Sequence, residues 1–210
     1  MAVDLNNLLI RSGQKGPFIL VGHSMAGIIL PSFIRLYPQE VKGIVFVDCS
    51  HPLQVKRFAG YPELTIKAPA QWQAKLMGDF GLLRLFYHDR YPSIAINDSI
   101  NIAAQDFIPE AAAGVIDEAN AFNSMADSAA LIRNFGDIPL VVLTGTAAKR
   151  ISDLQNPETG KAFMRIWLEL QNDHLHRSTN SKQIMATRSG HYIQLDQPEL
   201  VVDAIRGLVN

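Results

Sequence analysis

The sequence has little of several features that would assign a protein to a class at once. It contains one cysteine, Cys49, so it can form neither an internal disulfide framework nor a cysteine-based zinc site. Its charges nearly cancel, with 19 Lys and Arg against 20 Asp and Glu, which argues against nucleic acid or an anionic membrane surface as a partner. No apolar run approaches the roughly 20 residues of a membrane span. These shortages favour a soluble globular protein.

The stretch MAVDLNNLLIRSG at the start also lacks the basic segment and long apolar core of a secretory signal peptide. We therefore expect a cytoplasmic protein. With 210 residues, 48% of them hydrophobic, the chain can bury a sizeable core as one domain, or as one domain with an insertion. We expect no metal and no cofactor.

Short apolar runs alternate with helical periodicity along much of the chain. Runs typical of strands buried on both faces occupy residues 18–21, 43–47, 138–143 and, more weakly, 183–186. Helical spacing covers residues 24–37 and 162–170, and a proline-led helix start stands at residue 198. Strands separated by helices predict parallel βαβ units. We therefore expect a three-layer α/β fold with a partial parallel sheet of about four strands.

Residues 52–136 interrupt this alternation, because they contain helical patches and several prolines but no convincing strand. We interpret them as a helical cap inserted into a core made of residues 1–51 and 137–210. The cap carries large apolar side chains that either floor a hydrophobic pocket or only pack the cap onto the core. These are Trp72, Phe80, Leu83, Phe86 and Tyr87.

The seven residues VGHSMAG join the first predicted strand to the next helix. A serine between small residues in a tight strand–turn–helix is typical of a nucleophile elbow, in which the strand and helix pass close together. Here Gly22 and Ala26 are the small residues around Ser24. The following helix N-terminus makes the backbone N–H of Met25 a candidate oxyanion donor. The alternative is that Ser24 is an ordinary helix N-cap.

A histidine follows the last predicted strand, in the stretch SGHY. A serine nucleophile needs a base within hydrogen-bond reach, and a loop at the carboxyl end of a parallel strand is well placed to supply His191. We expect His23 to point away from the serine, and His51 to pack or cap unless it lines the site. We expect the remaining histidines to be solvated, namely His88, His174 and His176.

Together these motifs resemble the α/β-hydrolase superfamily. The resemblance covers nearly the whole chain outside the predicted cap, through PFILVGHSMAG, RLYPQEVKGIVFVDCSHP, PLVVLTG and SGHYIQLDQPELVVDAI. It implies that Ser24 is the nucleophile and His191 the base. A serine at the elbow also argues against the dehalogenases and epoxide hydrolases of this superfamily, which use Asp there.

The resemblance leaves two candidates for the acid that orients the histidine. Most family members carry it a few residues beyond a Gly after the strand that follows the cap, where this chain has Ala148, and the next acid in that loop is Asp153. Some members carry it at the end of the strand after the nucleophile helix, which is Asp48 here. Burying an unpaired carboxylate is costly, so we favour Asp48 as the acid over a simple turn residue, and keep Asp153 as the alternative.

The resemblance implies a serine hydrolase that acts on a small carboxylic ester or a related acyl compound through a Ser-His-Asp triad and an acyl-enzyme. We expect an apolar small-molecule substrate, and neither nucleic acid nor a membrane as partner. Two alternatives stay open. One is an N-terminally truncated, catalytically impaired binding protein, and the other is a lyase, acyltransferase or cofactor-free haloperoxidase on the same scaffold.

Family members normally carry several strands before the nucleophile strand, whereas this sequence has only a short helical pattern at residues 3–12. If the chain is complete, the strand at residues 18–21 would form an exposed apolar sheet edge, which favours self-association. The loop that supplies the family's second oxyanion donor would then also be absent. Loss of one such donor costs about 10²–10³ in kcat.

Overall fold

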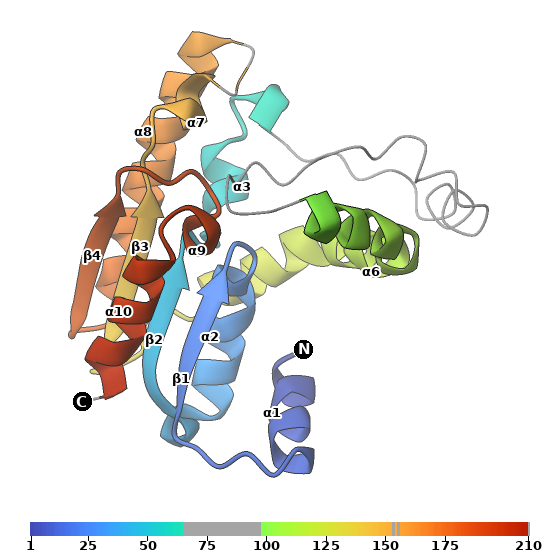
Figure 1. The fold of residues 1–210 in the computed structure, drawn as a ribbon. Helices are drawn as coiled ribbons and strands as arrows, with labels where there is room; N and C mark the ends of the chain where they lie inside the picture. Colours follow the sequence, from blue (N-terminus) through green and yellow to red (C-terminus); the bar gives the residue numbers. More distant parts are fainter. Residues whose placement is uncertain (65–97, 153, 155, 210) are drawn as a thin grey trace.

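The computed structural model describes residues 1–64, 98–152, 154 and 156–209. Within these ranges one parallel sheet of four strands runs in the order β1-β2-β3-β4 (Figure 1). The strands are β1 Phe18–His23, β2 Val41–Val47, β3 Leu140–Gly145 and β4 Ser181–Ala186. The predicted α/β fold class with a partial parallel sheet is confirmed, and the strand bounds differ from the predicted ones by a few residues.

Helices cover both faces of this sheet. The helices of the described residues are α1 Ala2–Arg11, α2 Ala26–Leu36, α3 Gln54–Arg57, α6 Asp98–Ala130, α7 Lys149–Ser152, α8 Pro157–Asp173, α9 Ile193–Asp196 and α10 Pro198–Val209. Short 3-10 turns occupy Pro38–Glu40, Pro62–Leu64 and His174–Arg177. Helix α10 lies on one side of the sheet, and α2 and α8 lie on the other (Figure 1). The three layers follow from this arrangement.

Strand β2 shows why the strands appear in the sequence as unbroken apolar runs. Ile44 and Phe46 belong to the core cluster that packs against α2, whereas Val45 and Val47 belong to the cluster that packs against α10. Successive side chains of a strand point to opposite faces, so a strand covered on both faces needs apolar residues at every position. Both faces of β2 are therefore core.

The described part of residues 52–136 is helical. It contains α3, the 3-10 turn Pro62–Leu64 and the long helix α6, whose end packs on α2 through Ala126, Ala129 and Ile28. The division into a core of residues 1–51 and 137–210 and a cap of residues 52–136 stays a prediction. The apolar cap residues proposed for the pocket lie outside the described residues, namely Trp72, Phe80, Leu83, Phe86 and Tyr87.

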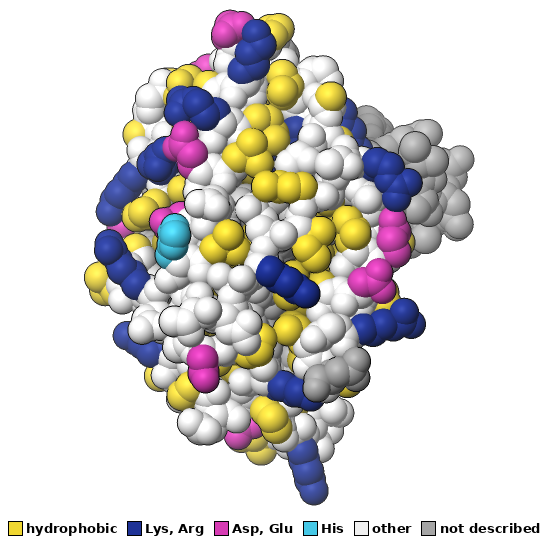
Figure 2. Space-filling model, turned by 90° about the vertical axis from the view of Figure 1, so that its left-hand side faces the viewer, with side chains coloured by type: hydrophobic (Ala, Val, Ile, Leu, Met, Phe, Trp, Pro, Cys, Tyr) yellow, Lys and Arg dark blue, Asp and Glu magenta, His cyan; other side chains and the backbone are white. Residues whose placement is uncertain are grey.

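Strands β1 and β4 are the two edges of the described sheet. The expected self-association through the edge at residues 18–21 stays a prediction. Figure 2 views the molecule from the β4 side, where basic and acidic side chains are interspersed with apolar ones. Among the helices in the described ranges, none combines the length and apolar character needed to cross a lipid bilayer.

Candidate active site

Ser24 occupies the turn between β1 and α2. Its backbone is in the left-handed region, with φ 53°, which is uncommon for a residue other than glycine and is concentrated at functional sites. The Ser24 carbonyl accepts hydrogen bonds from the N–H groups of Gly27 (3.2 Å) and Ser50 (2.7 Å), which fix the turn. Met25 is the N-cap of α2 and makes no side-chain cap. The N-cap alternative for Ser24 is therefore wrong.

Small residues let β1 and α2 approach each other around this turn. A Cβ atom added to Gly22 would lie 2.6 Å from the Ala26 Cβ and 2.7 Å from the Leu30 Cδ1, closer than van der Waals contact allows. One added to Gly27 would collide with the Ser50 carbonyl oxygen. The strand and the helix thus pass as closely as a nucleophile elbow requires.

Ser24, His191 and Asp48 lie in a row at the carboxyl ends of the strands. The Ser24 Oγ is 3.0 Å from the His191 Nε2, and the His191 Nδ1 is 2.7 Å from the Asp48 Oδ2. A carboxylate can only accept, so Nδ1 carries the proton and Nε2 is left to accept from the Ser24 hydroxyl. The structure thus brings together three side chains that the sequence analysis selected separately.

Asp48 directly follows β2 and is fully buried. Its backbone is also left-handed, with φ 46°. The Oδ1 atom accepts from the Gly145 N–H (3.0 Å), the Trp167 Nε1–H (2.9 Å) and the Arg150 Nη1–H (3.0 Å). A buried carboxylate is tolerated when it is paired in this way. Asp48 is therefore more than a turn residue, while the alternative acid Asp153 lies outside the described residues.

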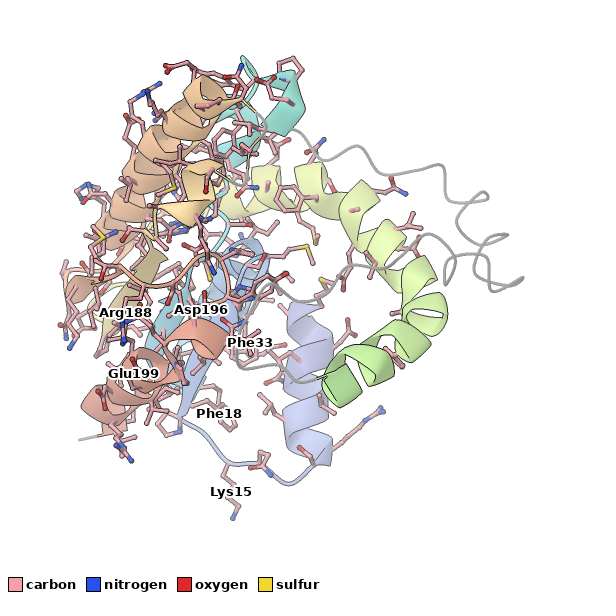
Figure 3. The ribbon with its side chains drawn as sticks, turned by 45° about the horizontal axis from the view of Figure 1, so that its top comes forward. Lys15, Phe18, Phe33, Arg188, Asp196 and Glu199 are labelled. Carbon is pink, nitrogen blue, oxygen red and sulfur yellow. The ribbon has the colours of Figure 1, made fainter. Side chains whose placement is uncertain are left out.

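The loop between β4 and α9 carries His191 and is held at several points. The Gly190 N–H donates to the Asp196 Oδ2 (3.1 Å), and the Ser189 hydroxyl donates to the Gln197 Oε1 (2.9 Å). An ion pair of 2.9 Å joins Arg188 to Glu199 at the start of α10, and Figure 3 shows this pair beside Asp196. These contacts hold the loop, and with it the His191 imidazole, in one position. Acid–base chemistry requires a base in a fixed position.

The Met25 N–H lies where the sequence analysis predicted it, next to Ser24 at the N-terminus of α2. No backbone carbonyl of the described residues outside α2 accepts this N–H. It is therefore free to donate to an acceptor beside the Ser24 Oγ, at the positive end of the helix.

The structure places the ring of His23 against His191, while the prediction that His23 points away from Ser24 stays a prediction. Its Nε2–H donates to the His191 carbonyl oxygen at 2.9 Å, and its ring centroid lies 4.5 Å from that of His191. Burial, and then the nearby charge of His191, lower the pKa of His23. A neutral imidazole thus packs against the candidate base, a contact for which the sequence held no signal.

His51 has the packing and capping role that we predicted as the alternative to lining the site. Its Nδ1 accepts the Leu53 N–H at 3.1 Å. The prediction that His174 is solvated is wrong. It is fully buried, with its ring centroid 4.6 Å from that of His51 and 5.0 Å from that of Phe46. His176 is exposed as expected, and His88 lies outside the described residues. Polar neighbours in the sequence concealed the burial of His174.

We expect these buried histidines to make the protein less stable in acid. Burial, and then the charge of Arg177, lower the pKa of His51 from 6.5 to about 4. The unfolded chain therefore binds this proton first, and the free energy of unfolding falls as the pH drops from 6.5 towards 4, by about 3 kcal/mol for His51. Urea unfolding measured across this range tests the slope.

Two variants separate the contribution of His51 from the general effect of acid. His51→Phe keeps a ring against His174 but cannot titrate, so its slope should be clearly shallower than that of the native protein. His176→Gln, at an exposed histidine, should leave the slope unchanged. Equal slopes in all three proteins would contradict the prediction.

A cavity of about 370 Å³ opens beside His191. Apolar side chains make up part of its wall, namely Leu64, Leu154, Phe163 and Tyr192. Lys149 and Asp196 also line it and pair with each other, with 3.2 Å between Nζ and Oδ2. Glu63 and Arg150 complete the charged part of the lining, so the cavity presents both apolar and charged side chains next to the candidate base.

The fold is a parallel α/β sheet with a serine elbow and a histidine loop at its carboxyl edge. The chain belongs to the alpha/beta hydrolase family. The family model matches residues 2–204. Among curated proteins, the chain is 24% identical to "Probable transporter efuK" of Hormonema carpetanum and 23% identical to an AB hydrolase superfamily protein of Gibberella zeae, each over 100% of this chain. A thermophilic esterase from Thermogutta terrifontis has the same fold, with TM-score 0.57 and 21% identity over 99% of this chain and 70% of its own.

This chain is shorter than the proteins that it matches. It spans 32% of the length of the Hormonema carpetanum relative and 70% of the length of the Gibberella zeae relative.

Proposed function

We propose that this protein is a serine hydrolase of small carboxylic esters or related acyl compounds. One observation carries the proposal, namely that hydrogen bonds connect three side chains at a nucleophile elbow. The Ser24 Oγ lies 3.0 Å from the His191 Nε2, and the His191 Nδ1 lies 2.7 Å from the Asp48 Oδ2. We call these three hydrogen-bonded side chains the line. The esterase from Thermogutta terrifontis among the solved structures of the same fold supports this reaction class.

Each residue of the line has a role in the proposed reaction. The Ser24 Oγ attacks the acyl carbon while the His191 Nε2 takes its proton, and the Met25 N–H stabilises the oxyanion. Asp48 holds the imidazole in the required tautomer and stabilises its charged form. His191 then returns the proton to the leaving alcohol, and water, activated by the same histidine, hydrolyses the acyl-enzyme.

The substrate class follows from the cavity beside His191. The apolar part of its wall suits a small apolar acyl or alcohol group. Its charged side chains have partners within the protein, because Lys149 pairs with Asp196, Arg150 pairs with Asp48, and Glu63 accepts the Thr159 hydroxyl. A lyase or an acyltransferase would use the same serine and histidine, so product analysis has to distinguish these reactions from hydrolysis.

Labelling with a fluorophosphonate probe tests the proposal, because the probe reacts with an activated serine. We expect the folded protein to be labelled and Ser24→Ala to remain unlabelled. Ser32→Ala, on α2 but away from the line, should be labelled like the native protein. The absence of labelling in folded native protein would overturn the proposal. Labelling without turnover of short p-nitrophenyl esters would exclude simple ester hydrolysis and favour a lyase or transferase.

A further inference from the structure

The loop after β3 supplies a cation to the site. The family's usual place for the acid holds Ala148 here, and two residues later Arg150 turns inwards from the short helix α7. Arg150 is 9% exposed, which is rare for an arginine without a buried partner. The loop that would otherwise carry the acid therefore carries a positive charge.

Arg150 is held in one position by contacts of two kinds. Its Nη1 donates to the Asp48 Oδ1 at 3.0 Å and to the Gly145 carbonyl oxygen at 2.9 Å. Its guanidinium carbon lies 5.1 Å from the centroid of Trp167 and 5.3 Å from that of Phe163. Stacking on aromatic faces and hydrogen bonding in the guanidinium plane together fix the charge against the carboxylate.

The two oxygens of Asp48 have different partners. The Oδ2 atom accepts from His191, whereas the Oδ1 atom accepts from Gly145, Trp167 and Arg150. Of the last three donors, Arg150 alone carries a charge. The carboxylate thus lies between a permanent cation and an imidazole that becomes a cation when it takes up a proton.

We propose that Arg150 is a positioning residue that sets, through Asp48, the pH at which His191 takes up a proton. The proposal rests on the proposed function for its catalytic meaning. A carboxylate favours the charged imidazolium, and a fixed cation on the same carboxylate opposes that charge in a buried site where screening is weak. With Arg150 paired to Asp48, His191 therefore stays neutral and able to act as a base at a lower pH than it would beside Asp48 alone.

Other groups around His191 do not take over this effect. They are His23, Tyr192, Glu63, Lys149 and Asp196. Burial lowers the pKa of His23, so that ring stays neutral, and the lysine and aspartate pair with each other. Glu63 is a carboxylate, which cannot act as a cation on Asp48, and it accepts the Thr159 hydroxyl at 2.7 Å. Among the described residues, Arg150 and His191 are the cations that form ion pairs with Asp48.

Two substitutions separate the charge from the hydrogen bond. Arg150→Gln keeps an amide donor but removes the charge, and we expect the acid limb of the kcat/KM profile to move to higher pH by about one unit. Activity on that limb then falls about tenfold at a given pH. Arg150→Lys keeps the charge and should return the limb towards its native position, even if weaker positioning lowers kcat. Trp167→Phe removes a neutral donor to the same oxygen and should move the limb much less.

An NMR titration of the His191 imidazole in the free protein gives a second readout that needs no turnover. We expect His191 in Arg150→Gln to take up its proton at higher pH than in the native protein. If the protein hydrolyses no ester, this titration still decides the effect of Arg150. Identical titrations in native protein and Arg150→Gln, or an equal shift in Arg150→Lys, would overturn the proposal while leaving the proposed function intact.

Discussion

Replacing Asp48 with Asn should lower kcat for ester hydrolysis by about four orders of magnitude. Three donors meet the Oδ1 of Asp48, so the amide oxygen of Asn would face them and its NH₂ group would face His191. The Nδ1 atom would then have to accept, and the proton would move to Nε2. An imidazole in that tautomer cannot take the proton of Ser24. Steady-state kinetics with a short p-nitrophenyl ester measure the loss.

Asp153→Asn is the matched control, because Asp153 is the other acid that the sequence offers for the role. We expect it to keep near-native activity. Circular dichroism and thermal unfolding of both variants check that they fold, since Asp48→Asn also leaves Arg150 without its charged partner. Full activity in Asp48→Asn together with a large loss in Asp153→Asn would reverse the assignment of the acid.

Phe46→Ala should lower the free energy of unfolding by about 3–5 kcal/mol. Phe46 is fully buried in β2, and its ring centroid lies 6.5 Å from that of Phe135 and 5.0 Å from that of His174. Truncation removes these contacts and leaves a cavity that the sheet and its covering helices cannot fill. The loss is a large fraction of the 5–15 kcal/mol that stabilises a typical domain.

Equilibrium unfolding in urea measures this effect. Leu131→Ala provides the control, because Leu131 is also apolar but 82% exposed, and we expect its unfolding free energy to change by less than about 0.5 kcal/mol. A similar loss in both variants would show that the core around Phe46 is not packed as described.

The strands were predictable because burial on both faces leaves a strong local pattern. The run at residues 43–47 is apolar throughout, and β2 extends it by only two residues. The weak prediction at residues 183–186 has a physical reason, because β4 is an edge strand that begins with Ser181 and Lys182, both tolerated where one side is open. Local sequence therefore reports the number of strands and their places in the chain better than their ends.

The surroundings of the candidate site were less predictable because they depend on pairing between distant segments. Arg150 reaches Asp48 across 102 positions, and no local pattern marks an arginine that will be buried. His174 stands among polar neighbours and is nevertheless covered by Phe46 and His51. The motifs thus indicate which groups are able to react, whereas the environment that would tune them appears only in three dimensions.

The line of side chains also has a consequence for the order in which the candidate site would assemble during folding. Ser24 and His191 are 167 positions apart, and Asp48 and His191 are 143 apart. Contacts with such long sequence separation close large loops, and their entropic cost delays them relative to local structure. A folding intermediate with β1, α2 and β2 in place would hold the elbow and the acid but no base. We therefore expect turnover to appear only after β4 has docked, which would make activity a stricter measure of complete folding than helix content.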